Sequence, residues 1–192
     1  MTSTGASIYA SISAAIGALS GELHGGASTK VVKMLEDIGE ISRVERWIDK
    51  KLDLNERIMG IGHAVYRTTD PRARILKEIS RRLGTIKGES RWFEITKKIE
   101  EYATNEVERR KGIKLYPNVD LYTPSIYHLL GISSDLFTPI FASSRIAGWC
   151  AHIIEEKFAE AQPKPELYRP KARYIGNYCG PQDCSYISIG QR

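Results

Sequence analysis

Glycine and proline divide this 192-residue chain into segments of helical length, and this spacing constrains the fold more than any other feature. The clearest segment is "TTDPRARILKEISRRLG", in which Asp70 is a candidate N-cap and Pro71 suits the first helical position. Gly84 is expected to end this helix. Its apolar residues recur at helical spacing and predict a buried face, formed by Ile75, Leu76, Ile79 and Leu83.

Further helices are predicted on both sides of this segment. In chain order they cover residues 8–20, 28–38, 41–51, 90–111, 124–130 and 135–158. Ser28 is expected to cap the second of them, and Asp53 is expected to cap a single turn. The sequence shows no strand–helix alternation and no G-x-G-x-x-G motif after a strand pattern, so a dinucleotide-binding fold is not expected. The predicted class is mainly α.

The charge of the chain limits the classes of partner that it is expected to bind. The formal net charge is +5, which suits either a solvated basic surface or an anionic small-molecule ligand. The basic clusters are short and form no recognisable nucleic-acid module, so no nucleic-acid partner is expected. No apolar run reaches the roughly 18 residues of a membrane span, and the small-residue segment near the N-terminus lacks the basic flank of a secretory signal. We therefore expect a cytoplasmic protein.

The three cysteines do not form a secreted disulfide framework. Cys150 lies in an apolar helical pattern and is expected in the core. Cys179 and Cys184 lie in a C-terminal loop segment, where a disulfide is one alternative. A metal site would need more ligands nearby, so no metal is expected.

Two histidines lie beside glycines. His24, in "GELHGGAS", precedes a predicted helix, where the positive end of the helix dipole favours a neutral imidazole that can donate a hydrogen bond to an enolate oxygen. The alternative is a histidine that caps a turn. His63 follows Gly60 and Gly62, which would let backbone amides face a ligand. The alternative there is a tight turn with a solvent-facing imidazole.

Two charged residues are candidates of the same kind. Asp120, in "YPNVDLYTP", is either a catalytic base or a cap or turn residue. Arg145 lies in a helix of apolar and small residues, so it must be paired or face a polar cavity, because burying it alone is very costly. An anionic ligand is one way to satisfy this arginine.

Taken together, these segments resemble the citrate synthase family. The segments that carry the resemblance occur in the family's order and are "GALSGELHGGAS", "GIGHAVYRTTDPRA", "PNVDLY" and "FASSRIAGWCAHIIEE", followed by "LYRPKARYIG". The resemblance implies a citrate-synthase-like multi-helical fold. It also implies an acyltransferase of the tricarboxylic acid cycle, which condenses acetyl-CoA with oxaloacetate to give citrate and CoA. The CoA thioester is then a substrate, and no cofactor is expected.

The resemblance implies roles for three catalytic residues. Asp120 matches the base that removes a proton from the methyl carbon of acetyl-CoA, and His24 matches the histidine that stabilises the resulting enol. His63 matches the histidine that assists the carbonyl of oxaloacetate during attack. These residue types suit the chemistry, because proton abstraction from carbon needs a base and a hydrogen-bond donor on opposite sides of the enol.

Binding residues are implied in the same way. Arg72 and Arg145 match arginines that hold substrate carboxylates, for which guanidinium groups are well suited. Arg169 matches an arginine that reaches the site from the neighbouring subunit of a dimer. The loop expected to lie against the adenine end of CoA consists of Ile58, Met59, Gly60, Ile61 and Gly62.

The resemblance also implies a domain organisation. Residues 1–27 match a large-domain helix and the His24 motif, residues 28–117 a complete small domain, and residues 118–192 the C-terminal helices and tail of an incomplete large domain. The chain is roughly half as long as the family implies. The expected partners, besides oxaloacetate and acetyl-CoA, are therefore a second copy in a homodimer or a complementing N-terminal half.

Two alternatives to an active citrate synthase stay open at this point. The chain is a non-catalytic fragment or interaction subunit of the family, or it belongs to a 2-methylcitrate synthase that uses propionyl-CoA. The sequence also departs from the family's pattern at Ser28, where asparagine is frequent.

Overall fold

The computed structural model describes residues 1–21, 24–63, 65–158 and 167–168. These residues form helices with few other elements, which confirms the mainly α prediction. The α-helices are α1 (Ile8–Leu19), α2 (Ala27–Ile38), α3 (Val44–Asp53), α4 (Pro71–Lys87), α5 (Arg91–Lys111), α6 (Val119–Leu129) and α7 (Phe137–Phe158). The short 3-10 turns are η1 (Thr2–Thr4), η2 (Ile41–Arg43) and η3 (Ser134–Leu136).

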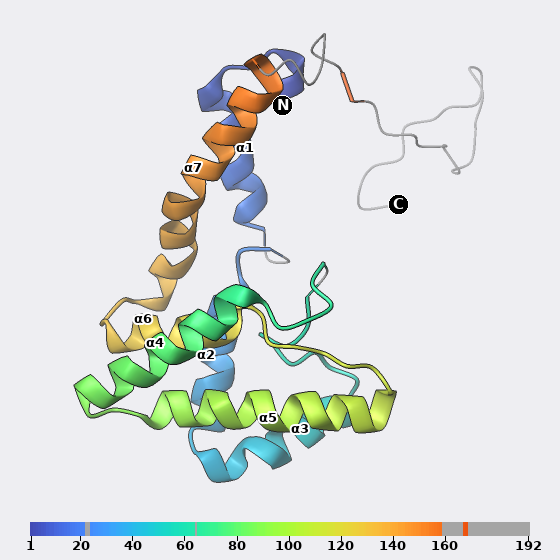
Figure 1. Ribbon diagram of the computed structural model, residues 1–192, viewed down its shortest axis with the longest axis vertical. Coiled ribbons are helices and arrows are strands. Elements are labelled where there is room, and N and C mark those ends of the chain that lie inside the picture. Colours follow the sequence, from blue (N-terminus) through green and yellow to red (C-terminus); the bar gives the residue numbers. More distant parts are fainter. Residues whose placement is uncertain (22–23, 64, 159–166, 169–192) are drawn as a thin grey trace, which may run out of the picture.

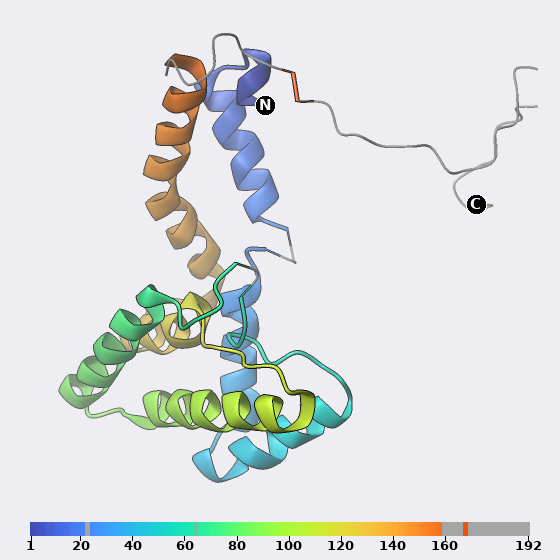
Figure 2. The same ribbon diagram turned by 45° about the vertical axis from the view of Figure 1, so that its right-hand side comes forward.

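The helices are arranged in two parts, which are visible in Figures 1 and 2. Helices α2 to α6 form one part, which we call the body, with α5 crossing α2 at a steep angle. Helices α1 and α7 run antiparallel beside each other and rise from the body as a second part, which we call the stem. The two parts meet where α1 ends and where α2 and α7 begin.

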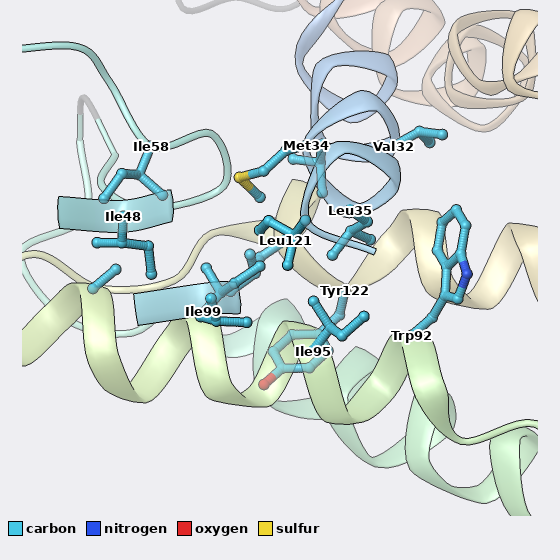
Figure 3. Close-up of a cluster of buried hydrophobic side chains, with 14 of the residues drawn as sticks. Val32, Met34, Leu35, Ile48, Ile58, Trp92, Ile95, Ile99, Leu121 and Tyr122 are labelled. Carbon is cyan, nitrogen blue, oxygen red and sulfur yellow. The ribbon is translucent and has the colours of Figure 1, made fainter. Parts of the chain in front are cut away.

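The core lies in the body, between α2, α3, α5 and α6 (Figure 3). Helix α2 crosses this core and buries apolar side chains on successive turns, at Val31, Leu35 and Ile38. Helix α5 buries Ile95 and Ile99 against them. The body therefore holds the large apolar cluster that fixes the relative positions of its helices.

Helix α4 packs on α6 through small side chains, and this differs from the prediction. The buried residues of α4 are Ala73, Ser80 and Gly84, whereas Ile75 is 64% exposed. The buried hydroxyls of Ser80 and Ser125 lie 2.7 Å apart, which joins the two helices by a hydrogen bond. The predicted buried face of α4 is therefore wrong for Ile75 and Ile79, which are exposed, whereas Leu76 and Leu83 are partly buried and Leu76 packs against the core. Small residues allow α4 to pack more closely on α6 than the isoleucines would.

Several predicted helix ends also need correction. Helix α4 runs through Gly84 and ends at Lys87, where Gly88 takes the left-handed conformation with a φ of 67°. Ser28 lies inside the first turn of α2 and does not cap it. Asp53 is the last residue of α3 and not an N-cap. Helix α6 begins at Val119, five residues before the predicted start at Pro124, because Asn118 accepts a hydrogen bond from the amide of Asp120.

An ion-pair network joins α3 to α5. Arg110 donates hydrogen bonds to Asp49, Asp53 and Glu106, at 2.6, 2.5 and 2.5 Å respectively. Arg109 also donates to Glu106. These two guanidinium groups hold the pKa of Glu106 at about 2, well below its ordinary value of 4.5. The network is thus an acid-sensitive link between the two helices.

The stem buries fewer side chains than the body. Only Phe137 and Ile153 of α7 are buried within the described residues, and Ile8, Ile16 and Ile154 are exposed. Cys150 is partly buried rather than in the core, contrary to the prediction. No helix within the described ranges is both long enough and apolar enough to span a membrane. The cytoplasmic location stays a prediction.

The predicted domain limits stay a prediction as well. Helix α6 falls in the segment 118–192, yet it packs on α2 and α4 and so forms part of the body. Helix α7 pairs with α1, as the assignment of both ends of the chain to one larger domain implies. Cys179 and Cys184, with their possible disulfide, and the tail that contains Arg169 lie outside the described residues.

Candidate active site

A cleft of about 250 Å³ lies where the stem meets the body. It is lined by five residues that the sequence singled out, which are His24, His63, Arg72, Asp120 and Arg145. These residues span more than a hundred positions of the chain, and the fold brings all five to one cavity. Apolar side chains complete the walls, among them Leu19, Val119, Phe137 and Phe141.

Four helices begin at this cleft. Ser28 lies in the first turn of α2, Arg72 in that of α4, Asp120 in that of α6 and Thr138 in that of α7, and all four line the cavity. Unpaired amide groups and the helix dipole give each helix N-terminus a partial positive charge. The cleft is therefore suited to anionic groups before any basic side chain is considered.

His24 is held by a tight turn between α1 and α2. The amides of His24 and Gly25 both donate to the carbonyl oxygen of Gly21, at 2.9 and 3.0 Å. A Cβ at Gly25 would lie 2.1 Å from the carbonyl oxygen of Leu19, so this position admits no other residue without moving the turn. The hydroxyl of Thr138 donates to the carbonyl of Gly25 at 2.7 Å and so attaches the turn to α7.

His63 has a defined tautomer. Its Nδ1 accepts hydrogen bonds from the amides of Val65 and Tyr66, at 2.9 and 3.1 Å. A neutral imidazole whose Nδ1 accepts must carry its proton on Nε2. His63 is exposed and lines the cleft, so its free Nε2–H is a donor for a ligand carbonyl or carboxylate.

Asp120 is partly buried in the first turn of α6 and is fixed from two sides. Its backbone amide donates to Oδ1 of Asn118 at 2.9 Å. Its carboxylate accepts a hydrogen bond from the hydroxyl of Ser28, with 2.6 Å between Ser28 Oγ and Asp120 Oδ1. The prediction left Asp120 as either a cap residue or a base, and the structure gives the capping role to Asn118, which leaves the carboxylate of Asp120 at the cleft.

Arg72 is oriented by a buried carboxylate. Asp70 is 0% exposed and accepts from Nε and Nη2 of Arg72 at 3.0 and 2.8 Å. This pair lowers the pKa of Asp70 and raises the pKa of Arg72, and in both cases the hydrogen bonds between the two side chains are the main cause. The negative charge of Asp120 acts on Arg72 in the same direction. Nη1 of Arg72 is left for a ligand.

Arg145 lies on α7 and faces the cleft, as its helical surroundings required. It is exposed, and its Cζ lies 5.6 Å from the centre of the Phe141 ring, one turn earlier in the helix. The ring thus supports the guanidinium by a cation–π contact without using its hydrogen-bond donors. Arg72 and Arg145 enter the cavity from the body and the stem respectively.

A second cavity, of about 650 Å³, adjoins the cleft. All five residues predicted to contact CoA line it, which are Ile58, Met59, Gly60, Ile61 and Gly62. His63 lines both cavities, so the two meet at this residue. Arg57 and Lys111 also line the larger cavity and supply positive charge there.

The glycine loop is attached to the start of α6. The amide of Gly62 donates to the carbonyl of Tyr116 at 2.7 Å, and the amide of Asn118 donates to the carbonyl of Gly60 at 2.9 Å. The side-chain Nδ2 of Asn118 donates to the carbonyl of Gly62 at 2.8 Å. Asn118 therefore connects the loop of the larger cavity to the turn that carries Asp120.

Sequence reasoning missed three residues that build the site. Ser28 was assigned to a helix cap, Asp70 was recognised as a cap but not as the partner of Arg72, and Asn118 was not singled out. The N-x-D spacing of Asn118 and Asp120 is a local signal for a capped first turn and was available in the sequence. The contact of Ser28 with Asp120 joins residues 92 positions apart and has no local signal.

Known proteins resemble this chain over nearly its whole length. A sequence model of the family described as "Citrate synthase, C-terminal domain" matches residues 1–171. Citrate synthase 2 of Bacillus subtilis is 49% identical over 185 residues, which are 96% of this chain and 46% of that protein. A 2-methylcitrate synthase of Mycobacterium tuberculosis is 40% identical over 177 residues, 92% of this chain and 42% of that protein.

A solved structure shares the fold. It is the ternary complex of citrate synthase from Thermoplasma acidophilum with carboxymethyl coenzyme A and oxaloacetate, with a TM-score of 0.80 and 36% identity. The match covers 99% of this chain and 48% of that one. The chain thus spans about half the length of the relatives it matches. From the family match, the identities and the shared fold it follows that this chain belongs to the citrate synthase family and corresponds to its C-terminal domain.

Proposed function

We propose that this chain supplies the catalytic residues for the condensation of acetyl-CoA with oxaloacetate to citrate and CoA. The observation that carries the proposal is the convergence of Asp120, two histidines and two arginines on one cleft beside the glycine-loop cavity. A carboxylate base, imidazole donors and guanidinium groups are the set that this reaction requires. Four helix N-termini around the same cleft favour substrates that carry several carboxylates.

The first step is removal of a proton from the methyl carbon of acetyl-CoA by Asp120. The proton passes to the carboxylate of Asp120, the pair of electrons left on carbon forms an enolate with the thioester carbonyl, and His24 donates a hydrogen bond to the negatively charged oxygen of that enolate. Asp120 is fixed by Ser28, and His24 is held by the Gly25 turn, so both groups are oriented before substrate arrives.

The second step is attack of the enolate carbon on the carbonyl carbon of oxaloacetate. His63 donates its Nε2–H to the carbonyl oxygen, which gains negative charge as the carbon–carbon bond forms. Arg72 and Arg145 hold the carboxylates of oxaloacetate. Water then hydrolyses the thioester of the citryl-CoA product, which gives citrate and free CoA.

The adjoining cavity is the proposed site of CoA. The glycine loop contacts the adenine end, while Arg57 and Lys111 lie near enough to the loop to attract phosphate groups. In this arrangement the thioester end passes His63 and reaches the cleft. His63, which lines both cavities, would then lie beside the thioester.

We further propose that the working enzyme contains more than this chain. The relatives are about twice as long, and α1 and α7 leave apolar side chains exposed at Ile8, Ile16 and Ile154. The N-terminal half of the family's fold, as a preceding segment or as a separate chain, would cover this stem. A homodimer would in addition bring Arg169 of one copy to the cleft of the other.

The proposal is tested by following free thiol from CoA after addition of acetyl-CoA and oxaloacetate. The chain is assayed alone and after addition of the N-terminal half of the Bacillus subtilis relative, which is purified separately. Release of thiol that depends on oxaloacetate, and that is lost in His63→Ala and Asp120→Asn, is the expected result. Absence of thiol release in both preparations would contradict the proposal and favour a non-catalytic member of the family.

Propionyl-CoA is a second candidate substrate, because a 2-methylcitrate synthase is 40% identical to this chain. The same residues would remove a proton from the methylene carbon next to the thioester. Comparison of kcat/KM for acetyl-CoA and propionyl-CoA in the same assay distinguishes the two. We expect acetyl-CoA to be preferred, because the more similar Bacillus subtilis relative is a citrate synthase.

A further inference from the structure

We propose that Ser28 is a positioning residue for Asp120, and that its hydroxyl sets the orientation of the carboxylate that acts as a base. This inference rests on the proposed function, in which Asp120 removes the proton from the acyl-CoA. Ser28 itself need not touch substrate. The two residues meet across the cleft, 92 positions apart in the sequence.

The geometry of the contact is close and specific. Ser28 Oγ lies 2.6 Å from Asp120 Oδ1, a short distance that is typical of a hydroxyl donating to a carboxylate. Both side chains are partly buried and both line the cleft. In the described part of the chain, the hydroxyl of Ser28 is the one hydrogen-bond donor found on this carboxylate. Asn118 holds only the backbone amide of Asp120 and leaves the side chain to Ser28.

Because the Ser28 hydroxyl binds only one oxygen of the Asp120 carboxylate, it makes the two oxygens different. The hydroxyl of Ser28 occupies Oδ1, so Oδ2 is the oxygen left to receive a proton from substrate. The contact also restricts rotation of the carboxylate about its terminal bond, which otherwise is broad. The base is therefore presented with one defined oxygen toward the cleft.

Ser28 also links the base to His24. The two residues are four positions apart, and the turn that holds His24 leads directly into α2. Thr138 fixes the same turn to α7 through the carbonyl of Gly25. Movement of this turn would thus shift the enol-stabilising imidazole and the donor on Asp120 together. This coupling keeps the position of the Asp120 carboxylate constant relative to the imidazole of His24.

Removal of the Ser28 hydroxyl should lower kcat by about 10- to 100-fold, because a misaligned base loses near-attack geometry. Binding of oxaloacetate should change little, since Arg72 and Arg145 are not contacted by Ser28.

The experiment uses the active assembly, with Ser28→Ala and Ser28→Thr compared with the parent. We expect Ser28→Ala to show the lower kcat, with KM for oxaloacetate within about twofold of the parent. Ser28→Thr keeps a hydroxyl and should restore kcat to near the parent value. Ser144→Ala is the matched control, because its hydroxyl donates to the carbonyl of Ile140 within α7. A kcat of Ser28→Ala equal to that of the parent would overturn the proposal.

A second readout does not need turnover. The carboxylate stretching band of Asp120 is assigned in infrared difference spectra by its loss in Asp120→Asn, and its frequency is compared in the parent and in Ser28→Ala. A shifted band is expected, because the hydroxyl no longer binds one oxygen. An unshifted band contradicts the Ser28 contact even if the enzyme is active. Conversely, an inactive parent with a shifted band would reject the proposed function while leaving the contact in place.

Discussion

Asp70 and Arg72 form a pair in which a fully buried carboxylate orients an arginine toward the cleft. One carboxylate accepts three hydrogen bonds from the same residue, from the backbone amide at 2.9 Å and from Nε and Nη2 at 3.0 and 2.8 Å. Asp70 is thus both the N-cap of α4 and the support of Arg72. The guanidinium of Arg72 is thereby held in one orientation, which would reduce the entropy lost on binding of the proposed carboxylate substrate.

A replacement of Asp70 can test its role as the N-cap of α4 separately from its role as the partner of Arg72. Asp70→Asn keeps an oxygen that can cap α4 but loses the charge that holds the guanidinium. We expect KM for oxaloacetate to rise by about tenfold with a smaller change in kcat, because a misplaced arginine weakens binding of the carboxylate. Steady-state kinetics on the active assembly measure both constants. An unchanged KM for oxaloacetate would show that Arg72 does not depend on Asp70.

Asn118 offers a test of the link between the glycine loop and α6. Asn118→Asp keeps the oxygen that caps α6 but loses the Nδ2 donor to the carbonyl of Gly62, whereas Asn118→Ala loses both. We expect Asn118→Asp to raise KM for the CoA thioester without loss of helix stability. Asn118→Ala should in addition lower the free energy of unfolding by about 1 kcal/mol, the usual value of an N-cap. Kinetics and urea unfolding of both variants check this, and equal KM values in parent and Asn118→Asp would contradict it.

Gly60 is expected to tolerate no side chain. Its φ is 80°, and a Cβ there would lie 2.8 Å from the Cα of Leu121, which is backbone and cannot move aside. Gly88 has a similar φ of 67° but open space around it, so Gly88→Ala is the matched control. We expect Gly88→Ala to cost about 1 kcal/mol of unfolding free energy and Gly60→Ala about 2 kcal/mol more. Urea denaturation measures both, and equal costs would contradict the close contact.

The free energy of unfolding should decrease at low pH, because Glu106 becomes protonated there. Its pKa is about 2 in the folded chain and 4.5 as the ordinary value, so folding favours the ionised form. This contribution is complete above about pH 4.5 and is lost as the pH falls toward 2. Asp70, whose pKa is lowered by Arg72, adds to the loss in the same direction. Urea unfolding between pH 6 and pH 2 measures the decrease.

The control for this pH dependence is Glu106→Gln, which removes the titrating group. We expect the variant to be less stable than the parent at pH 6 and the difference between them to shrink toward pH 2. A difference that stays constant over this range would show that Glu106 is not held by Arg109 and Arg110. Asp37→Asn, at an exposed position of α2, should leave the pH dependence as it is.

The sequence predicted the helices well where local signals were strong. The capped start at Asp70–Pro71 and the predicted helix ends at residues 38 and 111 are seen in the structure, each followed by a glycine with positive φ, because such caps depend on neighbouring residues alone. The buried face of α4 was predicted only in part, because spacing cannot distinguish the exposed Ile75 and Ile79 from the partly buried Leu76 and Leu83. Which residues α4 buries is decided by α6, whose small Ser125 allows the close approach.

The candidate site was predictable from motifs but its supports were not. The two histidines, Asp120, Arg72 and Arg145 line one cleft, and the resemblance to a family was sufficient to name them. Ser28 and Asp120 are brought together by the packing of α2 on α6, and such long-range contacts leave no trace in spacing or composition. The roles assigned to these residues stay predictions until the kinetic variants are measured.

The turn at Gly25 restricts which substitutions this protein can accept during evolution. A Cβ there would meet the carbonyl oxygen of Leu19 and the methyl group of Thr138, so any residue other than glycine at this position forces the turn to move. Side chains that line the cleft can be substituted one at a time during evolution. A substitution of Gly25, in contrast, would displace the imidazole of His24, the preceding residue. Adaptation to a new acyl substrate would therefore proceed through positions such as Val119 or Phe141, which line the cavity and have side chains to vary.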